Sequence, residues 1–229
     1  MNIVEIIALT PDEARRIEEC GADRIELIAA FSEGGLTPSR MVIEKVVRSV
    51  NIPVNVMIRP HSRSFVYTPE EIAVMKEDIL AAKEFGANGV VFGALNAQKK
   101  ICRKRTKQLI GSCGGLEITF HSAVDELADL VEGIKVLAAY PQITNVLSSG
   151  GKGSITDNIP IIREMIRNSG HINVMVGGGL NVENIVRIKT ETGATQFHFG
   201  IAARRDKSCA GGIDTQKLKE LVRICKQNN

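Results

Sequence analysis

Short apolar segments alternate with longer amphipathic ones along the whole chain. The apolar segments are rich in Val, Ile and Leu, which is typical of strands buried on both faces of a parallel sheet. We expect strands at residues 3–8, 24–29, 53–58, 89–92, 116–120, 144–147, 172–176 and 195–199.

The amphipathic segments predict helices between these strands. The clearest lies at residues 69–85, where Ile72, Met75 and Ile79 recur at helical spacing and Gly86 can end the helix. Further helices are expected from residue 11 to about 21, from about residue 38, and at 102–113, 124–139, 155–168, 182–191 and 214–226.

Eight strand–helix units of similar length predict the fold. Gly-Ala pairs at 21–22, 86–87 and 193–194 stand just before strands, so each glycine can end a helix and turn the chain. Strands that alternate with helices form parallel sheets. We predict an α/β protein whose residues 1–229 form a single-domain (β/α)8 TIM barrel. A doubly wound open sheet would need two halves, and no linker divides the chain.

Composition narrows the classes of function. Hydrophobic residues make up 44% of the chain, charged residues 24%, and the net charge is +3. That charge is too small to indicate a nucleic-acid partner, and no apolar run reaches the ~20 residues of a membrane helix. The N-terminus lacks the basic region of a signal peptide, so we expect a cytoplasmic protein. Five cysteines without CxxC spacing favour free thiols over disulfides or structural zinc.

Polar residues on or just after the predicted strands are the candidate catalytic residues. Parallel barrel strands are normally apolar, and the active sites of such barrels lie at the carboxyl ends of the strands. Glu5 has two interpretations of equal weight, as a structural ion-pair partner or as a functional group. Arg59 is the expected partner of the buried carboxylates. The catalytic candidates are Glu26, Arg59, Glu117, His121 and His198.

Three consecutive glycines after the seventh strand indicate an anion site. Gly177, Gly178 and Gly179 lead toward a helix, and backbone N–H groups at such a turn can hold a phosphate or carboxylate. With Arg59, they form the predicted anion-binding site. Glu183, in the first helical turn, would compete with a bound anion. The basic run at 99–107 is expected to be a solvated helix face, whereas Arg204 and its basic neighbours after strand eight are closer to the predicted site.

Several motifs together resemble the CutC family, which is named for copper homeostasis. They are EGGLTPS, NIPVNVMIRP, GANGVVFGALN, EITFHSAVD, SSGG, VGGG and QFHF, in this order over roughly residues 3–203. The resemblance implies a TIM barrel, a cytoplasmic location, a homo-oligomer and a role in copper handling, with Cu(I) as the implied ion. The chain departs from the family pattern at Ile28, where Cys is common, at Asn55, where His is common, and at Ser122, where Arg is common.

Two functions therefore stay open. One is copper homeostasis with copper binding, which the resemblance implies, although Cu(I) prefers Cys and Met, and Met57 in the third strand would alone be a poor site. The other is an isomerase or lyase that acts on a small phosphorylated or carboxylated metabolite by acid–base chemistry. A Schiff-base aldolase is disfavoured because the strands carry no Lys. A divalent-metal site is a further alternative, with Glu26, Glu117, His121 and His198 as its ligands.

Overall fold

The computed structural model describes residues 2–227, in which eight parallel strands close into a barrel. The first and last strands, β1 (Ile3–Ala8) and β8 (Gln196–Phe199), pair with each other and complete the ring. The predicted TIM-barrel fold is confirmed. Between them, in chain order, lie β2 (Arg24–Leu27), β3 (Val54–Met57), β4 (Gly89–Phe92), β5 (Glu117–Phe120), β6 (Ile143–Ser148) and β7 (Asn173–Val176).

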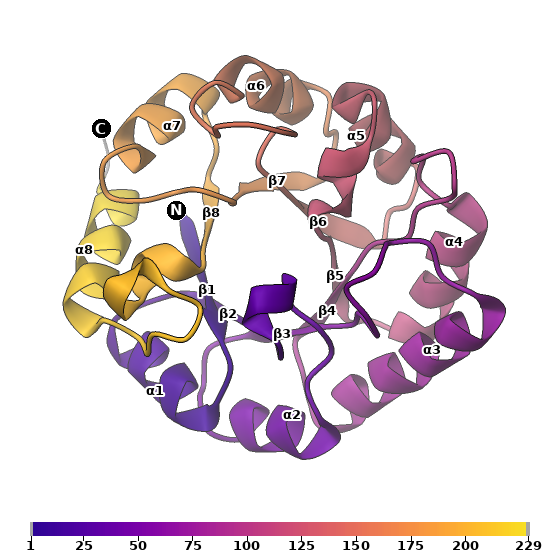
Figure 1. Cartoon of the computed structure of the whole chain (residues 1–229), viewed down its shortest axis with the longest axis horizontal. Helices are drawn as coiled ribbons and strands as arrows, with labels where there is room; N and C mark the ends of the chain where they lie inside the picture. Colours follow the sequence, from indigo (N-terminus) through magenta and orange to yellow (C-terminus); the bar gives the residue numbers. More distant parts are fainter. Residues whose placement is uncertain (1, 228–229) are drawn as a thin grey trace.

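Eight α-helices surround the barrel as an outer ring (Figure 1). Among the described residues, no helix is both long and apolar enough to cross a membrane. The helices are α1 (Pro11–Glu19), α2 (Arg40–Val47), α3 (Pro69–Glu84), α4 (Arg103–Cys113), α5 (Leu130–Ala138), α6 (Ile159–Arg167), α7 (Ile185–Thr192) and α8 (Thr215–Lys226). Four short 3-10 helices lie in the loops: η1 (Phe31–Glu33), η2 (Ser122–Glu126), η3 (Ile201–Ala203) and η4 (Arg205–Lys207).

Side-chain caps explain where several helices begin. The side chain of Thr68 accepts a hydrogen bond from the N–H of Glu71, and the Glu71 carboxylate accepts one from the N–H of Thr68, which is a capping box at the start of α3. Ser39 caps α2, so this helix begins at Arg40 rather than at the predicted residue 38.

Three predicted helices are shorter in the structure, among them the one predicted at 155–168, which spans only Ile159–Arg167. The segment predicted as a helix at 124–139 is split into η2 and α5, because the backbone of Leu127 is extended and ends η2, and Asp129 caps α5. The helix predicted from residue 182 begins at Ile185, because the side chain of Asn181 accepts hydrogen bonds from the N–H groups of Glu183 and Asn184. The three glycines therefore do not lead directly into a helix N-terminus.

The barrel interior is more polar than the layer between strands and helices. The main hydrophobic core fills that outer layer. Inside the barrel, a small apolar cluster of Ile7, Ile28, Met57 and Val91 lies toward the ends of the strands. The rest of the interior holds buried polar side chains, whereas branched apolar residues are usual inside such barrels. These side chains are Glu5, Arg24, Glu26, Asn55, Thr119, Asn145, Gln196 and His198.

The loop after β2 lies across the barrel axis. Figure 1 shows its helical turn η1, in indigo, at the centre of the ring. Gly34 and Gly35 follow η1 with φ values of 80° and 88°, a conformation that favours glycine. A Cβ on Gly34 would also lie 3.2 Å from Nη1 of Arg59. The two glycines of the EGG segment are therefore explained by a tight turn that packs against the buried guanidinium of Arg59.

Replacement of Gly89 by Ala should destabilise the barrel. A Cβ at this position would lie 2.7 Å from Oδ1 of Asn55 and 2.7 Å from the backbone oxygen of Glu117. Forcing a methyl group into this space should lower the free energy of unfolding by about 1–3 kcal/mol, as measured by urea denaturation. The matched control is Gly111→Ala in α4, where nothing lies within 4 Å of the added Cβ. That change should stabilise the protein by about 1 kcal/mol, and equal effects at both positions would contradict the packing argument.

Candidate functional site

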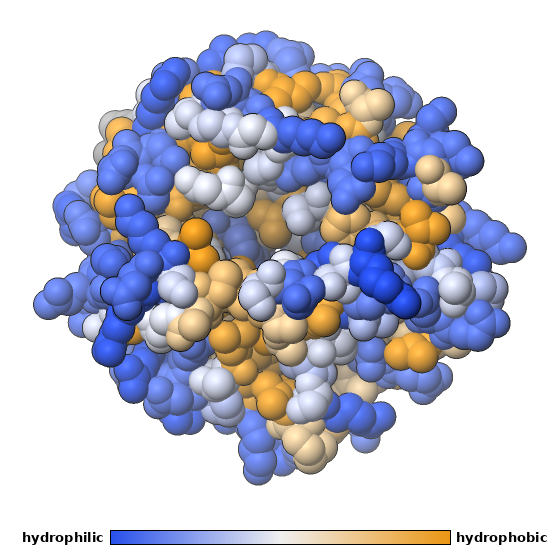
Figure 2. Space-filling view, viewed as in Figure 1, coloured by the Kyte–Doolittle hydropathy of each residue, from blue (hydrophilic) through white to orange (hydrophobic). Residues whose placement is uncertain are grey.

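A pocket of about 210 Å³ opens at the carboxyl ends of the strands. Figure 2 shows this face of the molecule hollowed near the barrel axis. Four of the five predicted catalytic residues line the pocket, namely Glu26, Arg59, His121 and His198. A larger hollow of about 690 Å³ lies on the outside between residues 96–103 and 127–136, but it holds none of the buried titratable groups. The barrel mouth is therefore the candidate site.

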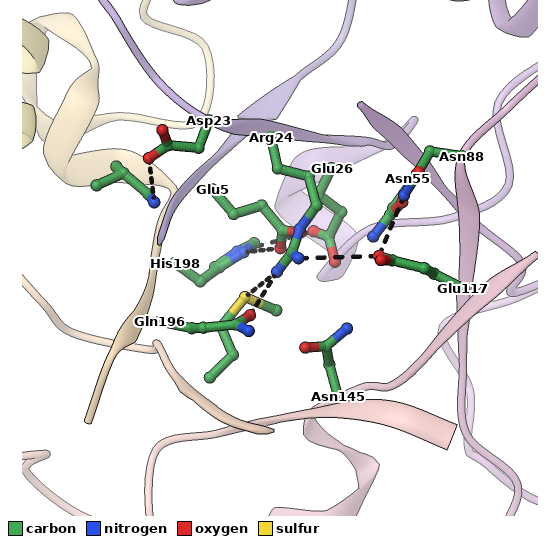
Figure 3. Close-up of polar contacts among 12 residues, drawn as sticks. Glu5, Asp23, Arg24, Glu26, Asn55, Asn88, Glu117, Asn145, Gln196 and His198 are labelled. Atoms are coloured by element: carbon green, nitrogen blue, oxygen red, sulfur yellow. Dashed lines mark hydrogen bonds and ion pairs between the residues drawn. The ribbon is translucent and has the colours of Figure 1, made fainter. Parts of the chain in front are cut away.

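A buried imidazole links two carboxylates at the floor of the pocket. Nδ1 of His198 lies 2.8 Å from Oε1 of Glu5, and its Nε2 lies 3.7 Å from Oε2 of Glu26 (Figure 3). Glu5 and His198 are opposite each other in the pairing of β1 with β8. Burial alone would lower the pKa of His198, but the two carboxylates outweigh it and raise that pKa. The imidazole is thus held toward its charged form.

Arg24 supplies the balancing charge beneath this group. Its Nε lies 2.5 Å from Oε2 of Glu5, and its Nη2 donates to Oε1 of Gln196 at 2.9 Å (Figure 3). Burial by itself raises the pKa of Glu5, but Arg24 and His198 reverse the effect and bring that pKa down to about 2. The partner of this carboxylate is therefore Arg24, and the expectation that Arg59 would pair with the buried carboxylates is wrong.

Glu26 is the carboxyl group whose acidity fits proton transfer near neutral pH. Burial raises its pKa from 4.5 to about 7, the Glu5 carboxylate adds to the increase, and His198 and Arg24 oppose it. Its Oε1 is buried and has no hydrogen-bond partner among the described residues. A carboxyl group with a pKa near 7 can accept or donate a proton at little cost.

His121 presents a neutral N–H group at the mouth. Its Nδ1 accepts a hydrogen bond of 3.1 Å from the backbone N–H of Ala123, so the neutral ring carries its proton on Nε2. Burial and the nearby charge of Arg59 lower the pKa of His121 to about 3. Nε2 has no partner among the described residues. Gly93 makes room for the ring, since a Cβ there would lie 2.7 Å from its Cε1.

Arg59 holds the loop that crosses the mouth. Its Nη1 donates to the backbone oxygens of Glu33, Gly34 and Gly35 at 3.1–3.3 Å, and its Nη2 donates to the backbone oxygen of Ser62. The buried Nε has no partner in the described part of the chain.

Phe65 covers the two donors from the loop after β3. Its ring centre lies 4.7 Å from Cζ of Arg59 and 4.9 Å from the ring centre of His121. These contacts explain why the unpartnered nitrogens of Arg59 and His121 are shielded from solvent, although both residues line the pocket.

The three glycines after β7 have different positions. Gly177 and Gly178 line the pocket, whereas Gly179 does not. The N–H of Gly177 donates to the backbone oxygen of Ser148, and a Cβ on Gly177 would lie 2.7 Å from Leu147. Gly177 is thus required by close packing. Gly178 remains a candidate for contact with an anion.

The SSGG loop after β6 already holds an anion, which is the carboxylate of Asp125. Ser148 donates a short hydrogen bond to Oδ1 of Asp125, and the N–H and hydroxyl of Ser149 donate to its Oδ2 at 2.9 and 2.8 Å. The N–H of Gly151 adds a bond of 3.2 Å. Burial raises the pKa of Asp125, and these hydrogen bonds act against the increase. The donors of this loop are consequently used within the chain.

Glu117 is separated from the other four candidates. It is the first residue of β5, its side chain is 43% exposed, and it contacts Asn88 and Arg24 at 3.1 and 3.9 Å (Figure 3). His121 follows the last residue of the same strand. The structure therefore does not bring Glu117 into the mouth, and the four metal ligands considered from the sequence do not form one cluster.

Arg204 is committed to the fold rather than to the pocket. It is 1% exposed and donates two hydrogen bonds of 2.8 Å to the carboxylate of Glu13. Its guanidinium also lies over the ring of Phe31, 5.1 Å from the ring centre. The charge of Arg204, the first basic residue after β8, is therefore neutralised within the chain.

One group within residues 2–227 has the spacing for a metal ion, and it consists of Glu5, Glu26 and His198. Two features disfavour a cation there. Nδ1 of His198 is already bonded to Glu5, and Arg24 places a positive charge against the same carboxylate. The geometry fits a proton-sharing group better than a metal centre.

Comparison with known proteins agrees with the motifs. The model of the CutC family matches residues 2–203. The chain belongs to the CutC family. Similar members include a human copper homeostasis protein cutC homolog, 41% identical over 205 residues, which are 89% of this chain and 75% of the relative. A CutC family protein of Mesorhizobium japonicum is 34% identical over 90% of this chain and 79% of its own.

Solved structures extend the comparison to the fold. A CutC protein of Streptococcus agalactiae superposes with a TM-score of 0.82 at 34% identity and covers 87% of this chain and 98% of its own. Phosphoribosyl anthranilate isomerase of Thermococcus kodakaraensis matches all of both chains with a TM-score of 0.69 at 16% identity. The second likeness shows a shared barrel fold alone.

The free energy of unfolding of this CutC family member should decrease as the pH rises from 4.5 to 7, because of Glu26. In that interval the carboxyl is ionised in the unfolded chain but still neutral in the folded one, so the folded state binds more protons and the free energy of unfolding decreases as pH rises. Glu26→Gln cannot ionise. Its stability relative to the native chain should therefore increase over this interval, as measured by urea denaturation at closely spaced pH values.

Glu183→Gln is the matched control for this measurement, because Glu183 is exposed on the loop before α7. Its stability should follow that of the native chain over the same pH interval. A flat difference between Glu26→Gln and the native chain from pH 4.5 to 7 would show that folding does not raise the pKa of Glu26.

Arg204→Met should destabilise the protein strongly. The change leaves the carboxylate of Glu13 without its guanidinium partner, and breaking a buried ion pair typically costs about 3–5 kcal/mol. Thermal and urea denaturation measure the loss. Arg205→Met is the control, since Arg205 is exposed and should change stability by less than about 0.5 kcal/mol. If both variants were equally stable, the structural role of Arg204 would be wrong.

Proposed function

We propose that this protein takes part in copper homeostasis and that the barrel-mouth pocket is its working site. Membership of the CutC family supports the first part, together with relatives such as the human one, whose name refers to copper homeostasis. The second part is supported by the gathering of Glu26, Arg59, His121 and His198 around one buried pocket. A cytoplasmic location and a homo-oligomer stay predictions.

The cysteines do not fit a Cu(I) site. Cys20, Cys113 and Cys225 are buried, and burial raises the pKa of each thiol, to about 12 for Cys113 and Cys225. Such thiols stay protonated, whereas the thiolate is the metal ligand. Cys102 and Cys209, which are partly exposed, take part in no cluster of metal-ligating side chains within residues 2–227.

The mouth itself is poor in soft ligands. Met57 lines the pocket, and one thioether is a weak site for Cu(I). Ile28 lines the pocket at the position where the family pattern commonly has Cys. We therefore propose that the role in copper homeostasis runs through a small anionic ligand of the pocket and not through copper held on thiols.

A second proposed function is acid–base catalysis on that small anionic ligand. The observation that favours it is Glu26, a buried carboxyl group with a pKa of about 7 that lines the same pocket as two unpartnered N–H groups. Groups tuned in this way are characteristic of catalytic sites. Arg59 supplies the positive charge that an anionic ligand requires.

A complementation experiment should separate the mouth from the thiols. In cells that lack this gene, growth at raised copper concentration should be restored by the native chain and by the Cys102→Ser/Cys209→Ser double variant. Glu26→Gln should fail to restore growth, because it removes the titrating group of the pocket. Glu183→Gln is the control and should restore growth fully, and immunoblots should show equal protein levels for all variants.

A titration with Cu(I) under reducing conditions tests whether the thiols bind copper. Tight stoichiometric binding to the native chain that disappears in the Cys102→Ser/Cys209→Ser variant would contradict the proposal. So would full complementation by Glu26→Gln.

A further inference from the structure

Three buried polar atoms without partners belong to residues on the same pocket. They are Oε1 of Glu26, Nε of Arg59 and Nε2 of His121. Native structures rarely leave such atoms unpaired, and an unpaired group in a pocket indicates a place for a ligand atom. One of the three is a titrating carboxyl group and the other two are N–H donors.

The three residues come from different parts of the barrel ring. Glu26 lies on β2, Arg59 follows the adjacent β3, and His121 follows β5, which is three strands from β2 in a ring of eight. Arg59 and His121 both contact the ring of Phe65. A ligand in the pocket would thus have the acid–base group of Glu26 and the N–H donor of His121 on different sides of it, with Arg59 between these two residues in strand order.

The two donors suit a single oxygen atom. Nη1 and Nη2 of Arg59 are both bonded to loop carbonyls, whereas its buried Nε–H has no partner among the described residues. His121 adds one N–H, because its Nδ1 is fixed by the N–H of Ala123. Two N–H groups that converge on one oxygen are the usual arrangement for stabilising an oxyanion.

The pocket is poorly equipped for a phosphate group, which needs several donors. The donors of the loop after β6 are occupied by Asp125, and the N–H of Gly177 is bonded to Ser148. After β8, Arg204 is neutralised by Glu13. The pocket volume of about 210 Å³ holds about seven water-sized groups. A three-carbon compound without a phosphate fits this space.

We infer that the pocket enolises a small, unphosphorylated carbonyl compound, with Glu26 as the base and the N–H groups of His121 and Arg59 as the donors to the carbonyl oxygen. The inference deepens the second proposed function and rests on it. Apolar side chains at the mouth, among them Ile7, Ile28 and Leu147, keep the base and donors poorly hydrated.

The step balances without a cofactor. The Glu26 carboxylate takes the proton from the carbon next to the carbonyl, and that C–H bond breaks. Its electron pair forms the carbon–carbon double bond, and the carbonyl electron pair moves to oxygen. The enolate oxygen is held by His121 and Arg59. The carboxyl proton of Glu26 exchanges with solvent, and donation of the solvent-derived hydrogen from Glu26 back to the carbon completes the exchange. Because its pKa is about 3, His121 is a neutral imidazole near pH 7 and donates through Nε2–H without carrying a positive charge.

Exchange of carbon-bound hydrogen in D₂O tests this inference directly. The native chain should speed loss of the proton NMR signal of pyruvate, a small anionic carbonyl compound, above a protein-free sample. The rate should rise with pH through about 7, because Glu26 must be ionised to act as a base. Glu26→Gln should lower the rate at least ~100-fold, and His121→Leu about 100-fold or more. His121→Gln, whose side-chain N–H can replace Nε2–H, should keep more of the activity than His121→Leu.

The controls are Glu183→Gln and His171→Gln, both exposed and outside the pocket, which should match the native rate. Circular dichroism should show that each variant is folded. Exchange no faster than in the protein-free sample, or an unchanged rate in both His121 variants, would overturn the inference. Exchange with dihydroxyacetone phosphate alone would overturn the unphosphorylated substrate class.

Binding of oxalate, a planar analogue of an enolate, distinguishes failure of the enolisation inference from failure of the second proposed function. Oxalate should bind the native chain more tightly below pH 7 than above it, because a neutral Glu26 accompanies the enolate. Binding that depends on Glu26 without any hydrogen exchange would reject enolisation and keep an anionic ligand in the pocket. No oxalate binding at any pH, with no carboxyl that titrates near pH 7, would reject the acid–base function as well.

Discussion

The buried ion pair between Arg24 and Glu5 is the interaction on which the barrel interior depends. Several titratable groups share a space that water hardly reaches, and each would tend toward its neutral form there. Arg24 keeps Glu5 ionised, and the ionised Glu5 accepts a hydrogen bond from His198. The imidazole of His198, fixed by this bond, in turn lies beside the Glu26 carboxylate. Burial raises the pKa of Glu26, and a series of contacts that starts at the other end of the barrel adjusts it.

The two ends of the barrel have different chemistry. At the ends where the strands begin, Arg24, Glu117 and Asn88 form contacts that satisfy one another. At the mouth, unpartnered donors and a titrating carboxyl face a small pocket. This division agrees with the general separation of stability and function in TIM barrels, in which the carboxyl ends of the strands carry the active site.

The sequence pattern predicts the fold. Of the five catalytic candidates that it indicates, four line one pocket. Alternation places Glu117 and His121 on one face of a strand, but a shared face does not bring two side chains together, because four residues at about 3.3 Å each separate them along the strand. The sequence does not indicate Arg24 as a partner, because a charged first residue of a strand resembles a solvated boundary. Asp125 and Phe65 come from loops, where no periodicity shows which neighbour a side chain will contact. From the sequence, the glycines after β7 indicate a backbone that needs conformational freedom. In the structure, Gly177 is needed because Leu147 and His198 leave no room for a side chain.

The loop over the mouth is fastened at two points. Arg59 binds its carbonyl groups, and the ring of Phe31 lies between Gly200 and the guanidinium of Arg204. A Cβ on Gly200 would lie 2.8 Å from that ring, so positions 31 and 200 share one limited volume although 168 residues separate them. In the evolution of this family, a larger residue at 200 is compatible with the barrel only when the residue at 31 becomes smaller. The two positions should therefore vary together among descendants of this chain, and the loop that covers the pocket would change shape with them.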